Sequence, residues 1–209
     1  DEIDGSAKFN YQLLANSNKD SISAVSLIRA YRLRGHLLAN LDPLNMRVSE
    51  YLDELHPEFY GFKKENYNKK IFLNGVINRE HANIKEILKF LKKTYCGPIG
   101  YEYMHISNPT ERKWFRDRIE KDDNALQFTK NGKEAILNKL IQAEGFEKFL
   151  HTKYVGTKRF GLDGGESLIP ALEQIIKIGG QSKIKEVKIG MSHRGRLNVL
   201  ANVLQKSYK

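Results

Sequence analysis

The C-terminal part of the chain has the pattern that most constrains the fold. A glycine-punctuated loop and helix, "TKYVGTKRFGLDGGESLIPALEQIIKIGG", are followed by one strand-like run, "KEVKIGM", and a second helix, "RLNVLANVLQK". This order is typical of an α/β domain with a parallel sheet. One strand cannot make a sheet, because its backbone groups and both of its faces need neighbours. We therefore expect residues 151–209 to be the truncated, poorly stable beginning of a larger α/β domain.

The chain before residue 151 is patterned as a helical assembly. Residues 1–20 are polar and lack periodicity, so a loose lead-in is expected there. Residues 21–150 are expected to form a mainly helical N-terminal domain, with helices from about Ser21 to Asn40, after Asn83, after Asn108 and over 132–150. Between them, residues 45–80 are interpreted as irregular, and short extended segments are expected at "KIFLNGV" and "YEYMHI".

Apolar residues spaced three and four apart predict the buried face of each helix. The first two stripes contain Ala24, Leu27, Ile28, Tyr31 and Leu38, and then Ile84, Ile87, Leu88 and Leu91. The next two contain Trp114, Phe115, Arg118 and Ile119, and then Ile136, Leu137, Leu140, Ile141 and Phe149.

Composition narrows the class of protein. The 209 residues carry a net charge of +10, but the lysines are spread along the chain and interleaved with glutamate. A solvated basic face is therefore favoured over a nucleic-acid partner, although a basic binding module centred on lysines 63, 64, 92 and 93 stays an alternative. No apolar run approaches the length of a membrane span, and Cys96 is the single cysteine. We expect a soluble intracellular protein without disulfides, in a reducing compartment.

The stretch "GMSHRGR", residues 190–196, lies at the junction between the expected strand and the last helix. In open α/β sheets, ligands bind beyond the carboxyl ends of strands, where helix N-termini favour anions. The arginines at 194 and 196 can fork onto phosphate or carboxylate oxygens. His193 can donate to an anion or transfer a proton near neutral pH. This loop is the best candidate for an anion site, and the alternative is that its arginines pair with carboxylates across a domain contact.

The stretch "KRFGLDGGES", residues 158–167, is a second candidate. Asp163 and Glu166 precede a helix, so simple capping chemistry accounts for them as well as a ligand site does. Phe160 is an aromatic residue in a glycine-rich loop, and its pattern alone does not decide between packing and binding.

Five blocks of sequence together resemble one family. They are "AYRLRGHLLANLDPL", "YCGPIGYEYMHI", "ERKWFRDRIE", "KRFGLDGGESLIPALEQII" and "GMSHRGRLNVLANVL". The blocks occur in the order found in the 2-oxoglutarate dehydrogenase component of the 2-oxoglutarate dehydrogenase complex, a thiamine-diphosphate enzyme of the transketolase superfamily. The resemblance covers about residues 21–209 and corresponds to an N-terminal portion of a much longer chain.

The resemblance implies roles for three residues. His193 is similar to the active-site histidine that recognises substrate, and Arg194 to a residue that contacts the cofactor diphosphate and the substrate region. Phe160 is similar to a residue lining the pocket beside the 2-oxo acid. The implied activity is decarboxylation of 2-oxoglutarate, a reaction of the tricarboxylic acid cycle, with transfer of the succinyl group to a lipoyl group. The implied partner is the lipoyl-bearing succinyltransferase component, the full-length enzyme is expected to be a homodimer, and a 2-oxoadipate dehydrogenase is the nearest alternative.

This chain departs from the family at a few positions. Gly161 and Asp163 stand where the family usually has serine and glutamate, and Ser192 where it often has alanine or proline. The GDG…N stretch that holds Mg²⁺ against the diphosphate is absent from the sequence, so the Mg²⁺ ligands are expected to lie outside these 209 residues. The chain by itself is therefore expected to be inactive.

Overall fold

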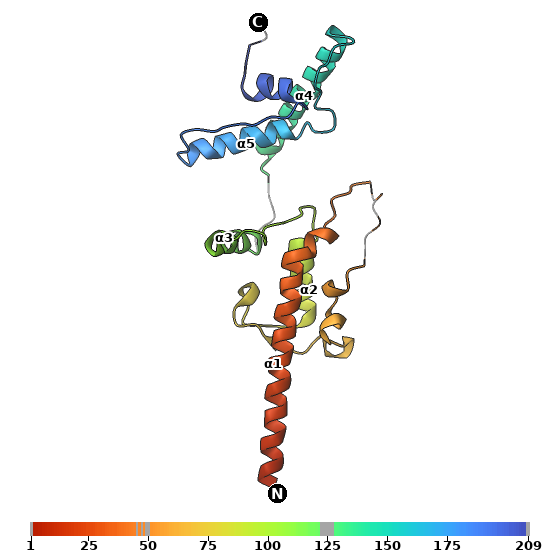
Figure 1. Cartoon of the computed structure of the whole chain (residues 1–209), viewed down its shortest axis with the longest axis vertical. Helices are drawn as coiled ribbons and strands as arrows, with labels where there is room; N and C mark the ends of the chain where they lie inside the picture. The colour runs from red at the N-terminus through yellow and green to blue at the C-terminus, as the bar shows by residue number, and fades with distance from the viewer. Residues whose placement is uncertain (1, 45, 47, 49–50, 122–127, 208–209) are drawn as a thin grey trace. The chain divides into compact units, whose positions relative to one another are not determined.

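A computed structural model describes residues 2–44, 46, 48, 51–121 and 128–207, with side chains described from residue 17 onward. The chain forms two compact units, Asp1–Ala125 and Leu126–Lys209 (Figure 1). We expected the second part to begin at residue 151. The division lies earlier because helix α4 (Lys130–Lys153) packs with the C-terminal helices α5 (Leu168–Gln181) and α6 (Arg196–Asn198).

The first helix, α1, spans Glu2–Arg34 and continues into a 3-10 turn at Gly35–Leu38. The expectation of a loose lead-in over residues 1–20 was therefore wrong. That segment has no proline, and adding a residue to an existing helix is far easier than starting one. A helix anchored by the packed part of α1 can extend through a segment that has no apolar stripe of its own.

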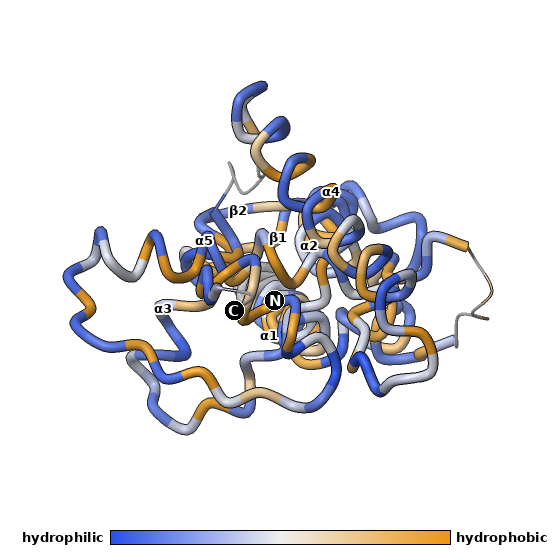
Figure 2. Tube along the Cα trace, turned by 90° about the horizontal axis from the view of Figure 1, so that it is seen from above, coloured by the Kyte–Doolittle hydropathy of each residue, from blue (hydrophilic) through white to orange (hydrophobic). Residues whose placement is uncertain are grey.

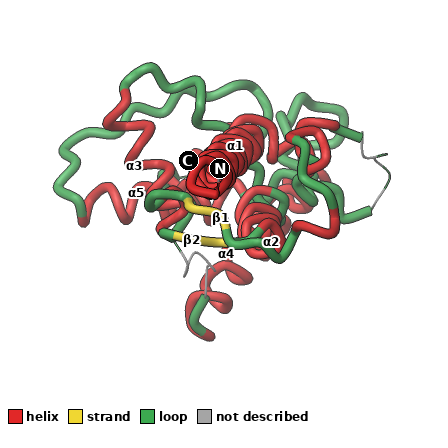
Figure 3. Tube along the Cα trace, turned by 90° about the horizontal axis from the view of Figure 1, so that it is seen from below, coloured by secondary structure: helices red, strands yellow, loops and turns green. Residues whose placement is uncertain are grey.

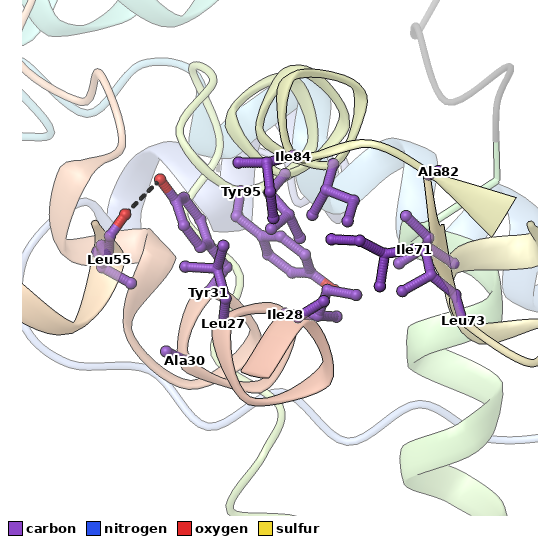
Figure 4. Close-up of a cluster of buried hydrophobic side chains, with 14 of the residues drawn as sticks. Leu27, Ile28, Ala30, Tyr31, Leu55, Ile71, Leu73, Ala82, Ile84 and Tyr95 are labelled. Atoms are coloured by element: carbon purple, nitrogen blue, oxygen red, sulfur yellow. Dashed lines mark hydrogen bonds between the residues drawn. The ribbon is translucent and has the colours of Figure 1, made fainter. Parts of the chain in front are cut away.

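The core of the first unit lies between α1 and α2 (Ile84–Tyr95), which pack against each other (Figure 4). The predicted stripes of α1 and α2 are confirmed, with Leu38 and Leu88 only partly buried. The stripe predicted over 132–150 was wrong, since Leu137, Ile141 and Phe149 are exposed, and α4 buries Ala143, Glu147 and Leu150 instead. The Tyr31 hydroxyl donates to the Leu55 carbonyl oxygen at 3.0 Å, so the irregular segment is fastened to α1. Helix α2 begins at a capping box, in which Asn83 and Glu86 each accept a backbone N–H of the other.

The segment before α2 is irregular, as predicted. It contains short 3-10 turns at Asp53–Leu55, Pro57–Tyr60, Lys64–Asn66 and Val76–Asn78. Strands β1 (Ile71–Phe72) and β2 (His81–Ala82) form one antiparallel pair, the only sheet among the described residues (Figure 3). The extended segment expected at "YEYMHI" has no strand partner in the described ranges, and it turns at Met104 and His105 instead.

Helix α3 (Pro109–Ile119) begins at the predicted cap, where Asn108 Oδ1 accepts from the Thr110 and Glu111 amides. The predicted buried face was wrong in part, since only Ile119 is buried, whereas Trp114 is 58% and Phe115 40% exposed. After α3, the buried Glu120 carboxylate receives two hydrogen bonds from the Arg32 guanidinium, at 2.6 and 2.8 Å.

The second unit has a small core of Ala143, Leu162, Ile169 and Val199, drawn from α4, the following loop, α5 and the C-terminal helical segment. That segment consists of α6 and a π-helical turn, Val199–Val203. The strand expected at "KEVKIGM" is not formed, and the described part of this unit contains no strand. Figure 2 shows hydrophobic stretches interrupted by hydrophilic ones along the chain, and no described helix is long and apolar enough to cross a membrane.

Candidate functional site

The two loops that the sequence marks as candidates meet in the second unit. The Gly195 amide donates to the Phe160 carbonyl oxygen at 2.6 Å. One guanidinium nitrogen of Arg194 donates to the carbonyl oxygen of Asp163. Because these residues are more than 30 positions apart in the sequence, the two hydrogen bonds fasten loop 158–167 to loop 190–196. The sequence did not predict either bond.

Phe160 is the centre of this junction. Its ring is stacked on the His193 ring, with centroids 5.3 Å apart and planes at 23°. The Arg196 guanidinium lies over the same ring, with Cζ 4.5 Å from the centroid, which is a favourable cation–π geometry. The backbone of Phe160 has a φ of 52°, a left-handed conformation that is uncommon for a bulky residue. The structure therefore brings the three expected site residues, Phe160, His193 and Arg194, into one constellation.

Gly195 is required where the second loop turns into α6. Its φ is 72°, and a Cβ built on it would lie 2.3 Å from Leu162 Cδ1. Both the conformation and the space therefore demand glycine. Gly190, which the sequence analysis placed in the same loop, has nothing within 4 Å of an added Cβ and no left-handed φ. Only the second glycine is needed for the shape of this loop.

A buried polar link below the loops was missed at the sequence level. Glu147 of α4 accepts hydrogen bonds at Oε1 from the Leu162 amide, at 3.1 Å, and from Asn198 Nδ2, at 2.9 Å. The Asn198 side-chain amide also donates to the Ala143 carbonyl oxygen at 3.0 Å. The available signal was one glutamate among apolar positions of the 132–150 helix, which is too weak to separate from a surface residue.

Charge is distributed unevenly around the junction. His193 and Arg194 are exposed, and Arg196 is half-buried. Arg194 bonds a backbone carbonyl and Arg196 lies over an aromatic ring, so neither contact neutralises a positive charge. In the described ranges, neither arginine forms an ion pair with a carboxylate. The loop therefore presents positive charge and an imidazole to solvent, which suits an anionic ligand.

Arg159 and Glu166 of loop 158–167 have structural partners. Glu166 Oε1 accepts from the Gly164 amide at 2.9 Å, so this glutamate stabilises the turn before α5. The capping alternative is not confirmed, because α5 begins at Leu168 without a side-chain cap. A pocket of about 550 Å³ lies between this loop and α4, and its lining has mixed charge, with Glu147, His151 and Arg159 among its residues. Among the described side chains, no group of three or more His, Cys, Asp or Glu residues is placed to hold a metal ion.

Known proteins are similar to this chain over nearly its whole length. No family model matches the chain. The "2-oxoglutarate dehydrogenase E1 component" proteins of Brucella canis, Brucella suis and Brucella abortus are each 57% identical to it over 198 residues. The aligned stretch covers 94% of this chain but only 20% of each relative. The resemblance inferred from the sequence is thereby confirmed, and over nearly its whole length this chain is similar to about one fifth of a 2-oxoglutarate dehydrogenase E1 component.

Proposed function

We propose that the chain is the N-terminal part of a 2-oxoglutarate dehydrogenase that decarboxylates 2-oxoglutarate and passes the succinyl group to a lipoyl group of a partner component. The observation that carries this proposal is the meeting of the two loops, which stacks His193 on Phe160 and leaves Arg194 exposed beside them. The names of the relatives support the same reaction.

Each of the three residues has a role that its surroundings allow. His193, exposed beside the Phe160 ring, donates a hydrogen bond to an oxygen of the 2-oxo diacid and acts in proton transfer. Phe160 forms an apolar wall next to the substrate carbons and orients the imidazole by stacking. Arg194 uses the guanidinium edges that do not contact Asp163 to bind anionic oxygens.

The exposed positive charge of this loop also fits the diphosphate of thiamine diphosphate, and Arg194 is the residue that would hold it. When bound, thiamine diphosphate supplies the electron sink for loss of CO₂ from a 2-oxo acid. The described side chains offer no cluster for Mg²⁺. We propose that the Mg²⁺ ligands, and the groups that activate the cofactor, belong to sequence beyond these 209 residues.

The missing sheet belongs to the same proposal. Residues 185–192 form no backbone–backbone hydrogen bond within the described part of the unit, and the side chains of Val187 and Met191 are exposed. The relatives are about five times as long as the aligned stretch, so they have enough chain for neighbouring strands. We propose that residues 151–209 begin a thiamine-diphosphate domain of α/β class, in which this segment is a strand of a parallel sheet. We also propose a homodimer in the bacterial cytoplasm or the mitochondrial matrix.

The proposal is tested with the full-length protein, supplied with thiamine diphosphate and Mg²⁺. Release of CO₂ is measured from 2-oxoglutarate and, separately, from 2-oxoadipate. We expect 2-oxoglutarate to be the better substrate, and His193→Ala to lower kcat/KM by about 10²–10⁴-fold, as is usual for loss of a proton-transfer group. The matched control is His105→Ala, which removes an exposed histidine of the first unit.

Two outcomes would contradict the proposal. A higher kcat/KM for 2-oxoadipate than for 2-oxoglutarate would show that the protein is a 2-oxoadipate dehydrogenase. Equal effects of the two histidine variants would separate the loop from catalysis. The 209-residue chain alone is expected to release no CO₂, and turnover by it would contradict the assignment of the cofactor-activating groups to other sequence.

A further inference from the structure

The Glu147 carboxylate joins three elements of the second unit through one oxygen atom. Oε1 accepts the Leu162 amide of loop 158–167 and the Asn198 side chain of the C-terminal helical segment, while the residue itself belongs to α4. Glu147 is 9% exposed and Asn198 is fully buried. The two bonds therefore lie inside the unit, where hydrogen bonds are least disturbed by water.

Burying a carboxylate between helices costs desolvation free energy. Its desolvation costs several kcal/mol unless hydrogen bonds or a cation compensate for it. In the part of the chain that the structure describes, no lysine or arginine forms an ion pair with Glu147, and the groups that donate to it are neutral amides. An apolar side chain of the same size would avoid that cost, but it would leave the Leu162 amide and one N–H of Asn198 without their acceptor. The glutamate therefore serves here to accept bonds from both segments.

The bonded groups lie close to the candidate site on both sides. Leu162 is two residues after Phe160, and Asn198 is two residues after Arg196, the cation over the Phe160 ring. Asn198 accepts at Oδ1 from Asn202 Nδ2 at 2.7 Å, which fixes the orientation of its side-chain amide toward Glu147. One carboxylate oxygen thus sets the distance between the segments that carry Phe160 and His193.

We propose that Glu147 is a positioning residue for the 2-oxo-acid site, holding loop 158–167 and the helix after His193 in the register that stacks Phe160 on the imidazole. The proposal rests on the proposed function for the identity of the substrate. The positioning of the two loops by Glu147 does not depend on that function, because the loops have this arrangement whatever the substrate is. Glu147 itself touches neither substrate nor cofactor.

The experiment uses the full-length protein with Glu147→Ala and Glu147→Gln, and with Glu144→Gln as the matched control. Glu144 lies one turn earlier on α4 and forms an exposed ion pair with Lys148. Four quantities are compared: KM for 2-oxoglutarate, kcat for 2-oxoglutarate, the melting temperature, and amide exchange in segments 160–165 and 193–199. A misplaced substrate group typically loses about one to two orders of magnitude of efficiency. We expect Glu147→Ala to raise KM about tenfold or more and to speed exchange in both segments.

The conservative variant separates positioning from folding. Glu147→Gln removes the negative charge but keeps an acceptor oxygen for the Leu162 amide and the Asn198 side chain. The KM of this variant should therefore stay close to the wild-type value. Glu144→Gln should change none of the four quantities. If Glu147→Ala fails to fold, Asn198→Ala is used instead, because it removes one of the two hydrogen bonds to Glu147. The same kinetic, melting and exchange measurements are then compared between Asn198→Ala and Glu147→Gln.

Two results would overturn the inference. An unchanged KM in a folded Glu147→Ala enzyme, with only the melting temperature lowered, would show a purely structural residue. Unchanged exchange in both segments would show that Glu147 does not hold them. If the wild-type enzyme does not act on 2-oxoglutarate, the proposed function fails by itself, and faster or unchanged exchange then decides for or against the positioning role.

Discussion

Replacing Gly195 by alanine tests how tightly the two loops are joined. Gly195 has a φ of 72°, and an added Cβ would lie 2.3 Å from Leu162 Cδ1, 3.2 Å from its Cγ and 3.3 Å from its Cβ. Rotating the end of the Leu162 side chain removes the first contact but not the other two. Leu162 is also part of the core of the second unit, so it has little room to move.

Two other glycines of the same loops provide the scale. Gly164 has a similar φ of 77° but meets nothing closer than an Arg194 nitrogen at 3.8 Å. A left-handed φ costs a non-glycine residue about 1–2 kcal/mol, which is the whole expected cost of Gly164→Ala. Overpacking a filled site adds about 1–3 kcal/mol, so Gly195→Ala should cost about 2–5 kcal/mol. At Gly161 the nearest atom is Oδ2 of the exposed Asp163 side chain, which can rotate away, and the next is Glu147 Oε2 at 3.3 Å, which must shift by only a few tenths of an ångström. We expect a cost of about 1 kcal/mol or less.

Native-state amide exchange measures these costs where they act. The Val199 amide donates to the Gly195 carbonyl oxygen at 3.0 Å, so its opening free energy reports on the start of the C-terminal helical segment. The expected order of loss in that free energy is Gly195→Ala, then Gly164→Ala, then Gly161→Ala. Equal losses for the variants at 195 and 164 would refute the reasoning, because they would show that Leu162 yields without cost and that the loops are not closely packed.

Three further predictions concern the first unit. Glu120→Ala should lower the free energy of unfolding by about 3–5 kcal/mol in denaturant titrations, because it leaves the mostly buried Arg32 guanidinium without its partner; a loss below about 1 kcal/mol would contradict this. Asn83→Ala removes the side-chain cap of α2 and should cost about 1 kcal/mol, measured in the same way. The hydroxyl of Tyr67, donating to Glu58 at 2.8 Å, lowers the pKa of that carboxyl, so Tyr67→Phe should raise the Glu58 pKa in an NMR titration. Because a lowered pKa contributes stability that is lost as pH falls through it, the variant should be more destabilising at neutral pH than in acid.

The sequence predicted best where one local rule decides the structure. Both caps were placed correctly, at Asn83 and Asn108, because a side-chain oxygen before a helix satisfies backbone amides regardless of the rest of the fold. The stripes of α1 and α2 were also correct, since residues three and four apart share a face of any helix. These rules need no knowledge of what packs where.

The failures all depend on neighbours that periodicity does not show. Residues 2–20 join α1 by extension of a packed helix, although they have no stripe. On α3, Trp114 and Phe115 lie together at the predicted face, but within the first unit only Ile119 is buried. The segment "KEVKIGM" has the composition of a strand but no partner strand among the described residues. A high β-propensity does not form a strand without a neighbour to pair with.

The candidate site has features that local sequence rules predict and features that depend on packing neighbours. The sequence identified the two loops, and the family resemblance singled out Phe160, His193 and Arg194, but neither predicted how the loops are joined. Three hydrogen-bonded contacts join them. The Gly195 amide donates to the Phe160 carbonyl oxygen, the Arg194 guanidinium donates to the Asp163 carbonyl oxygen, and Glu147 accepts from the Leu162 amide. All three join loops to loops or to α4, and none uses the backbone of residues 185–192. Pairing of that segment with further strands can therefore complete a sheet without breaking a bond that holds the site.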